Sequence, residues 1–278
     1  MLANVSSKAS SILTNEGFLQ FITNSTAMAL IVLLTVLWIS KKATKNMTLV
    51  PHTWQNRFEF VVEFLYNQLE GIVGKKQAPR AFPLLATLFI FILVSNWFGL
   101  VPGVGSIGWG EGTGFLSLSE VHDPLLRPGT ADLNTTLGLA LSAFIVWFYL
   151  TISEIGFWGF IVHTFGPKGG LKGVMGFIVA LVFLFVGVIE VVSILFRPVT
   201  LSLRLYGNIF AGENMLEAMT HLGGTYFGWL VALPFYFMEL MVGIVQALVF
   251  TLLTAVFTLL ICSHEEGHEE HGHGEKAH

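Results

Sequence analysis

Residues 173–221 have the sequence GVMGFIVALVFLFVGVIEVVSILFRPVTLSLRLYGNIFAGENMLEAMTH, an apolar run interrupted by only five charged side chains. A helix needs about 20 residues to cross the hydrocarbon core of a bilayer, so this stretch is long enough for one very long membrane helix. Gly223 and Gly224 predict a break after it, and a second long helix is expected at about 229–262.

Charge-free runs nearer the N-terminus predict three more spans, at about 18–39, 83–101 and 133–153, and the last of these can continue to His163. No A-x-A-like cleavage site follows the first run, so we expect a retained span and not a signal peptide. The segment 52–74 differs, because its apolar residues recur at helical spacing with charged residues between them. It is expected to lie on the membrane surface or to pack on other subunits, and the sequence leaves both alternatives open.

The composition excludes several classes of protein. Apolar residues make up 54% of the 278 residues and charged residues only 12%, so a soluble surface cannot be assembled. The single cysteine, Cys262, excludes a disulfide framework, and the net charge of -4 offers no basic surface for nucleic acid. We therefore expect an all-α integral membrane protein with about five membrane helices and one amphipathic surface helix, in a single polytopic domain, 1–262.

The short loops predict an orientation. In the five-span arrangement nine Lys and Arg residues fall on one side of the membrane, against Lys8 and Arg127 on the other. The positive-inside bias then places the N-terminus outside and the C-terminus in the cytoplasm. A bacterial inner membrane is favoured, because the chain shows no transit peptide. The nine residues are Lys41, Lys42, Lys45, Arg57, Lys75, Lys76, Arg80, Lys168 and Lys172.

Two motifs resemble ligand-binding sites, but their sequence context does not support such sites. Gly103, Gly105 and Gly108 spell G-x-G-x-x-G, but they follow a membrane span and no βαβ unit surrounds them, so no dinucleotide site is predicted. The tail 263–278 contains five histidines, which could gather ions for a metal transporter. No intramembrane His/Asp cluster exists to receive a metal, so we expect a disordered tail and no metal site or cofactor. The histidines are His264, His268, His271, His273 and His278.

Charged residues within the apolar runs are the stronger signal, since a charge at mid-bilayer costs at least ~3 kcal/mol and is normally kept for a function. At 100° per residue, five polar residues fall within about 40° of Arg204 on one face of the helix. Glu213 falls on the opposite face, toward something else such as the following helix, where Glu239 and Gln246 share a face. The five are Glu190, Ser193, Arg197, Thr200 and Asn208.

The spacing predicts two ion paths. Along a straight helix Glu190 lies about 21 Å from Arg204, and Glu213 lies about 13 Å from it on the other side. Arginine is never deprotonated and can act only as a fixed positive charge, whereas the carboxyl groups can titrate. The residues therefore indicate two offset paths that meet at a permanent cation. The alternative is a packing role, in which Arg204 pairs with Glu213 or Glu217 to lock two helices together.

The segment FRPVTLSLRLYGNIFAGE, from Phe196 to Glu213, resembles the signature helix of the subunit a family of F-type ATP synthases. Three further blocks resemble that family's other conserved blocks and occur in the same order: SNWFGLVPG from Ser95, TADLNTTLGLAL from Thr130 and QALVFTLLT from Gln246. The similarity covers roughly residues 50–262.

The resemblance implies a stator protein whose last two helices form a long, tilted hairpin against a rotating c-ring, and it extends the helix from Leu133 to about Phe165. It implies the c-ring, peripheral stalk subunit b and membrane lipid as partners, with no nucleotide site on this chain. By the same resemblance, the barrier charge that faces the ring carboxylates is Arg204. The implied outer half-channel contains Asn208, Glu213, Glu239 and Gln246, and the implied cytoplasmic half-channel contains Glu190 and Ser193.

Some relatives carry histidine at the position of Glu239, so this chain has two carboxyl groups where those relatives have one. If Glu213 and Glu239 approach closely, they will titrate as a coupled pair that shares a proton. We expect proton coupling, with ATP chemistry on other chains. A sodium-coupled version of the same subunit is an alternative, and so is a secondary or metal-ion transporter, for which no internal repeat is visible.

Overall fold

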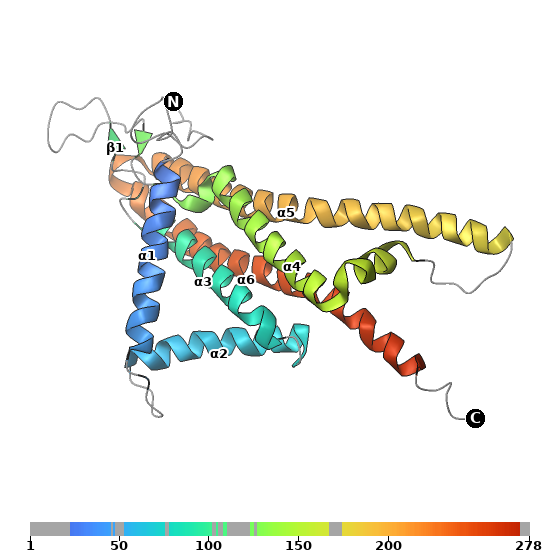
Figure 1. Cartoon of the computed structure of the whole chain (residues 1–278). Helices are drawn as coiled ribbons and strands as arrows, with labels where there is room; N and C mark the ends of the chain where they lie inside the picture. Colours follow the sequence, from blue (N-terminus) through green and yellow to red (C-terminus); the bar gives the residue numbers. More distant parts are fainter. Residues whose placement is uncertain are drawn as a thin grey trace.

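The structure, a computed structural model, consists mainly of helices (Figure 1). Five of the described helices are long and apolar enough to cross a membrane. The structure describes residues 23–45, 47, 53–75, 78–101, 104, 108–109, 123–124, 127–166 and 174–272. The expected all-α membrane class is confirmed, with one addition in the described part of the chain, a two-residue antiparallel ladder between β1 and β2. The elements are α1 (Asn24–Thr44), α2 (Thr53–Val73), α3 (Ala78–Gly99), β1 (Gly108–Trp109), β2 (Asp123–Pro124), the 3-10 turn η2 (Gly129–Ala131), α4 (Leu133–Phe165), α5 (Val174–Leu222) and α6 (Gly224–Gly272).

The first helix, α1, begins at a side-chain cap and ends among lysines. Thr23 Oγ1 accepts a hydrogen bond from the Thr26 backbone N–H, which satisfies one of the free donors of the first turn. Lys41 and Lys42 lie in the last turn, where cations are favourable beside the helix carbonyls. The helix thus runs to Thr44, five residues beyond the predicted end, because only its apolar part must lie in hydrocarbon. The predicted residues 18–22 lie outside the described part of the chain.

The amphipathic helix α2 packs on the chain itself. Its buried residues Leu65, Leu69 and Val73 recur at one-turn spacing and contact α3 and α6. The opposite face is open, with Phe60 70% exposed. The apolar stripe of α2 thus covers neighbouring helices, which leaves the open face for lipid or for another subunit. Gly74, in a left-handed conformation (φ 82°), turns the chain from α2 toward α3.

Two helices differ internally from simple rods. α3 starts at Ala78 and not at 83, so Pro83 lies in its second turn, where a proline removes only one hydrogen-bond donor. α4 is broken at Gly156, whose backbone conformation (φ 75°, ψ 160°) lies outside the helical region. Glycine adopts this conformation readily because it has no Cβ. The helix predicted at 133–165 is therefore two helical segments. Asp132 caps the first, its Oδ1 accepting from the Asn134 N–H.

The last two helices form a hairpin. α5 and α6 lie side by side near their turn, diverge away from it, and run strongly tilted relative to α1 (Figure 1). Gly223 and Gly224 (φ 65°) make the turn, and Gly228 allows close approach, because a Cβ there would lie 2.5 Å from the Thr220 carbonyl oxygen. α6 thus begins five residues before the predicted start at 229, with Pro234 inside it.

The tail differs from the prediction. The segment 263–278 was expected to be disordered, yet α6 continues to Gly272, ten residues past the predicted end at 262. The physical reason is that these residues include no proline, and Glu and His are compatible with a helix. The final six residues, 273–278, lie outside the described part of the chain.

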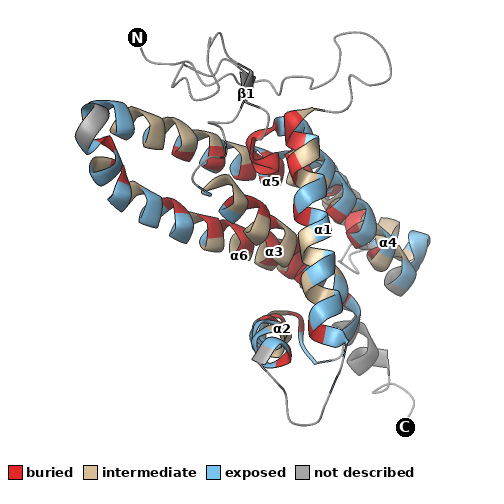
Figure 2. Ribbon diagram, turned by 90° about the vertical axis from the view of Figure 1, so that its left-hand side faces the viewer, coloured by how far each residue is buried: buried red, intermediate tan, exposed pale blue. Residues whose placement is uncertain are grey.

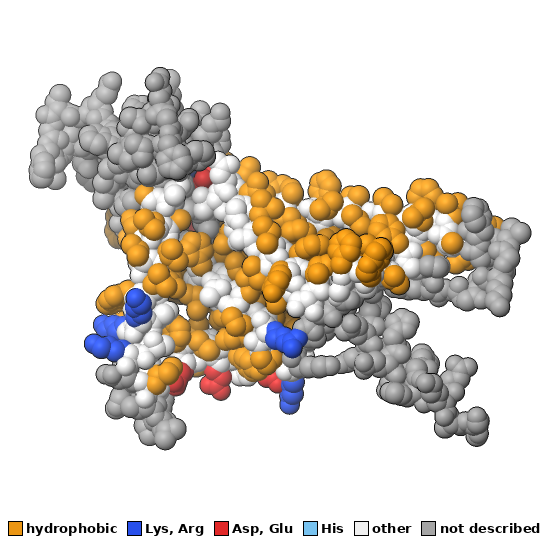
Figure 3. Space-filling model, in the orientation of Figure 1, with side chains coloured by type: hydrophobic (Ala, Val, Ile, Leu, Met, Phe, Trp, Pro, Cys, Tyr) orange, Lys and Arg blue, Asp and Glu red, His pale blue; other side chains and the backbone are white. Residues whose placement is uncertain are grey.

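The core lies where α3, α5 and α6 meet (Figure 2). Ile92 of α3, Leu205 of α5 and Phe250 of α6 are fully buried in one cluster. The outer face of α5 is exposed and apolar, and hydrophobic side chains cover it in Figure 3. Lys and Arg side chains gather along the opposite edge, around the end of α1 and α2, with Asp and Glu side chains between them (Figure 3). One edge of the bundle is thus charged and its flank is apolar.

Two neighbouring leucines of α5 test this packing. Leu205 is 0% exposed and Leu203 is 50% exposed. We expect Leu205→Ala to lower the free energy of unfolding by about 2–5 kcal/mol, because it leaves a cavity in the core. Leu203→Ala, the matched control, should change it by less than about 0.5 kcal/mol. The measurement is thermal unfolding of the purified chain in detergent, and equal effects of the two substitutions would contradict this core.

Candidate functional site

Arg204 lies on the outward face of α5. Its side chain is exposed, and it makes no ion pair or hydrogen bond within the described part of the chain. Three residues of the polar stripe predicted around it, Ser193, Thr200 and Asn208, are exposed like Arg204, whereas Glu190 and Arg197 are half-buried. Beside the stripe, the exposed side chains of α5 are apolar, as at Val192, Phe196 and Leu203.

The acidic residues that could have paired with Arg204 are engaged elsewhere. Glu213 pairs with Arg127, with 3.5 Å between Glu213 Oε2 and Arg127 Nη2. Glu217 faces His221 one turn later, with 3.9 Å between Glu217 Oε1 and His221 Nε2. The structure therefore does not have the alternative arrangement, in which Arg204 pairs with one of these two glutamates to lock two helices together.

Asn208 of α5 and Gln246 of α6 form a hydrogen bond between the two helices of the hairpin. Asn208 Nδ2 donates to Gln246 Oε1 at 2.7 Å, which joins α5 to α6. Gln246 is buried, and its Nε2 has no hydrogen-bond partner among the described residues. A polar link thus runs from the outward face of α5 into the interior of the hairpin.

Glu213 and Glu239 lie close to each other across the same hairpin. Glu239 is only 5% exposed, and it lies within electrostatic range of Glu213. Gly212 makes the approach possible, because a Cβ at that position would collide with the Glu239 carboxylate. Glycine therefore lets the α6 carboxyl group reach the backbone of α5. The two carboxyl groups therefore face each other across the hairpin, each within electrostatic range of the other.

The helix α3 fixes the rotation of α6 beside this pair. Trp97 Nε1 donates to the Leu240 carbonyl oxygen and Asn96 Nδ2 to the Gly243 carbonyl oxygen, both at 3.4 Å. Gly243 admits this contact, because a Cβ there would lie 3.3 Å from the Asn96 Cβ. The sequence analysis gave Asn96 and Trp97 no role. Their signal was polar atoms at the end of an otherwise apolar span, directed at carbonyl groups between Glu239 and Gln246.

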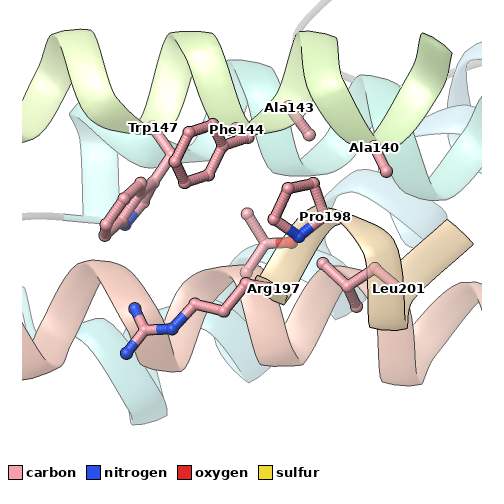
Figure 4. Close-up of a pocket in the computed structure, with 8 residues that line it drawn as sticks. Ala140, Ala143, Phe144, Trp147, Arg197, Pro198 and Leu201 are labelled. Carbon is pink, nitrogen blue, oxygen red and sulfur yellow. The ribbon is translucent and has the colours of Figure 1, made fainter. Parts of the chain in front are cut away.

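Near the other end of the stripe, Arg197 turns inward. Its guanidinium lies 5.7 Å from the centre of the Trp147 ring on α4 (Figure 4). It also lies within electrostatic range of Glu190. A cavity of about 20 Å³ lies there, lined by both residues of the Trp147–Arg197 contact and by Thr254 of α6. Such a volume can hold one water molecule. Glu190 and Ser193 make no hydrogen bond between helices within the described residues.

Arg127 is the functional candidate that sequence reasoning missed. It entered that reasoning only as a loop charge for the orientation, whereas its guanidinium is buried and pairs with Glu213. The available signal was its position, since Arg127 is the only Lys or Arg between Arg80 and Lys168. A lone cation between apolar spans is a candidate partner for an intramembrane carboxylate.

No group of three or more potential metal ligands occurs among the described residues. The side chains of the tail histidines lie outside the described part of the structure. The site is thus built from amides, carboxyl groups and arginines of α5, α6 and the segment before α4.

Comparisons with known proteins agree on one family. The family model described as ATP synthase A chain matches residues 22–258. The chain is 34% identical over 247 residues to the ATP synthase subunit a of Mycobacterium ulcerans (strain Agy99), covering 88% of this chain and 87% of that protein. It is 34% identical over 227 residues to that of Geobacter sulfurreducens, covering 82% of each. It is 34% identical over 215 residues to that of Moorella thermoacetica, covering 77% and 79%.

The close approach of the two carboxyl groups can be tested at Gly212. A Cβ added there meets the Glu239 carboxylate, so we expect Gly212→Ala to lower the free energy of unfolding by about 1–3 kcal/mol through overcrowding. Gly138→Ala on α4, where a Cβ meets nothing within 4 Å, is the matched control. It should leave the stability unchanged or raise it by up to about 1 kcal/mol. Thermal unfolding of the purified chain measures both, and a neutral Gly212→Ala would contradict the geometry.

Proposed function

The chain belongs to the ATP synthase A chain family, and from this premise we propose that it is the proton-conducting stator subunit of a rotary F-type ATP synthase. Two offset half-channels load and unload the carboxyl groups of a c-ring, which couples proton flow to ring rotation and ATP synthesis. Nucleotide chemistry takes place on other subunits of the complex.

The observation that carries this proposal is the position of Arg204. It is a permanent cation on the outward face of a membrane helix, and no described acidic residue of the chain pairs with it. A charge kept in hydrocarbon at such cost indicates a partner of opposite charge. A ring of subunits that each present one carboxyl group would supply that partner repeatedly, and the apolar residues around Arg204 would contact the ring helices.

The proposed outer half-channel begins one turn from Arg204. Asn208 lies on the same face of α5 and donates to Gln246, which connects the ring face to the interior. Glu239 lies seven residues before Gln246 on the same face of α6, beside Gly212 and within electrostatic range of Glu213. These polar groups follow the hairpin toward its turn. Ring carboxyl groups could therefore exchange protons with one side of the membrane through this set alone.

The proposed cytoplasmic half-channel lies on the other side of Arg204. Glu190 and Ser193 occupy the same stripe at about 21 Å and 17 Å from Arg204 along α5. Glu190 is within electrostatic range of Arg197, so a cation accompanies this end of the stripe. The two sets of polar residues therefore reach Arg204 from opposite directions, and neither crosses the membrane by itself.

Arg204 separates the two paths by its charge. A ring carboxyl group beside a guanidinium is favoured in its ionised form, so it must release its proton before passing. The arginine cannot accept that proton, and protons therefore cannot leak directly from one path to the other. A proton must instead travel with the rotating ring.

The proposed setting is the inner membrane of a bacterium, with the N-terminus outside, the C-terminus in the cytoplasm and peripheral stalk subunit b as a second partner. The Lys and Arg side chains gathered around the end of α1 and α2 support this orientation, because the positive-inside bias counts Lys and Arg (Figure 3). The exposed face of α2 and the outer face of α1 are available for lipid and for the stalk.

Arg204→Lys tests the function directly. Lysine keeps a positive charge but loses the planar, permanently protonated guanidinium, so we expect ATP-driven acidification of inverted membrane vesicles to fall at least tenfold. Blotting verifies equal assembly, and Arg57→Lys on α2 is the matched control, expected to pump normally.

Three outcomes would contradict parts of the proposal. Pumping near the unmodified rate in Arg204→Lys vesicles would make Arg204 a packing residue. Pumping that requires sodium and continues with a protonophore would replace the proton with sodium as the coupling ion. Transport of a metal ion by the purified chain would favour a secondary transporter.

A further inference from the structure

The segment that carries Arg127 is firmly held at the outer end of the bundle. Residues 127–132 are all buried, and they contact α1, α3, α4 and α5 through η2. Gly99 of α3 leaves room for Pro128, whose Cγ would lie 2.5 Å from a Cβ at that position. Gly129 lies against α1, where a Cβ would be 3.4 Å from the Ala29 Cβ. The backbone around Arg127 is thus positioned by packing on both sides.

This segment delivers a buried guanidinium to Glu213. The side chain of Arg127 is 6% exposed and that of Glu213 is 23% exposed, with 3.5 Å between Nη2 and Oε2. A charge at this depth is retained only when an opposite charge accompanies it. The pair joins residues that are 86 positions apart in sequence, so it forms only when the hairpin and the outer segment have assembled.

Acidic groups outnumber permanent cations around Glu213. Arg127 faces it from the outer segment, Glu217 from its own helix and Glu239 from α6. Glu217 in turn faces His221, and Asp132 lies at the end of the segment that holds Arg127, where it caps α4. Among the described residues near Glu213, Arg127 is the one permanent cation for three glutamates.

Like charges this close cannot all be ionised in a site of low dielectric constant. The guanidinium compensates Glu213, which is its direct partner. Glu239 is more deeply buried and has no ion pair within the described part of the chain. An uncompensated buried carboxylate is costly, and the neutral acid avoids that cost.

We infer that Arg127 is a positioning residue of the outer path, which holds Glu213 as a fixed carboxylate and leaves Glu239 as the group that takes up and releases the proton. The inference rests on the proposed function. In each transfer one proton binds to a carboxylate oxygen of Glu239 and later leaves it, while the Arg127–Glu213 pair stays ionised. The two carboxyl groups therefore have different roles, although the sequence presents them as equivalent.

The test uses inverted vesicles that contain the whole complex and are loaded with buffers between about pH 6 and pH 9. The lumen of such vesicles corresponds to the outer side, and the initial rate of ATP-driven proton transport is measured against luminal pH. In Arg127→Gln, Glu213 loses its cation and the carboxyl pair retains its proton to higher pH. We expect the profile to move toward alkaline pH by about one to two units.

Arg127→Lys keeps the charge and should retain the profile of the unmodified chain, which a loss of packing alone would not explain. Arg57→Gln on α2 is the control for removing an arginine. Combining Arg127→Gln with Glu213→Gln should return the profile to that of Glu213→Gln alone, because Arg127 acts through Glu213. An unshifted profile in Arg127→Gln, or a further shift in the double variant, would overturn the inference.

A second measurement needs no substitution and applies even if Arg127→Gln does not assemble. A hydrophobic carbodiimide modifies protonated carboxyl groups, and mass spectrometry of the treated complex locates the adduct. The inference predicts an adduct at Glu239 and none at Glu213 near neutral pH, and any other distribution between these two residues overturns it. Arg204→Lys vesicles prepared in parallel separate the two claims: normal pumping there refutes the proposed function, whereas lost pumping there with an unshifted Arg127→Gln profile refutes only this inference.

Discussion

A charge within the membrane part of this chain is costly unless something compensates it, because hydrocarbon offers no water to solvate it. The structure compensates two of its arginines and leaves a third at the surface. Arg127 and Glu213 compensate each other across the chain, Arg197 lies over the Trp147 ring within electrostatic range of Glu190, and Arg204 faces outward. The uncompensated cation is thus at the surface of α5, where a second molecule can meet it.

Glycines decide how closely the helices that carry these charges approach. Gly212 admits the Glu239 carboxyl group to the backbone of α5, and Gly243 admits Asn96 of α3 to α6. Gly228 lets the two helices of the hairpin meet near their turn. Small residues are common at contacts between membrane helices, where close packing and interhelical hydrogen bonds replace the hydrophobic effect. Here they set how closely α6 approaches α3 and α5.

Sequence reasoning succeeded where the signal lies within one helix. Charge-free runs predicted the membrane helices, and helical spacing placed Glu190, Ser193 and Asn208 on the face of Arg204. It was less accurate at helix ends, as at Thr44 and Gly272. A helix can continue into water beyond its apolar residues, so the end of an apolar run does not mark the end of the helix. The break at Gly156 was also missed, since a lone glycine in an apolar run does not by itself specify a change of backbone conformation.

The sequence alone determined that the chain is an all-α membrane protein, that α5 carries a polar stripe around Arg204, and that Glu213 lies on the opposite face of the same helix. These features follow from composition and from the fixed geometry of one helix. Only the tertiary structure decided which groups pair, because Arg127 and Glu213 lie 86 residues apart and no local periodicity relates them. It also made Glu213 and Glu239 unequal, since the distance to a cation, which depends on how separate helices pack, determines which carboxylate is compensated.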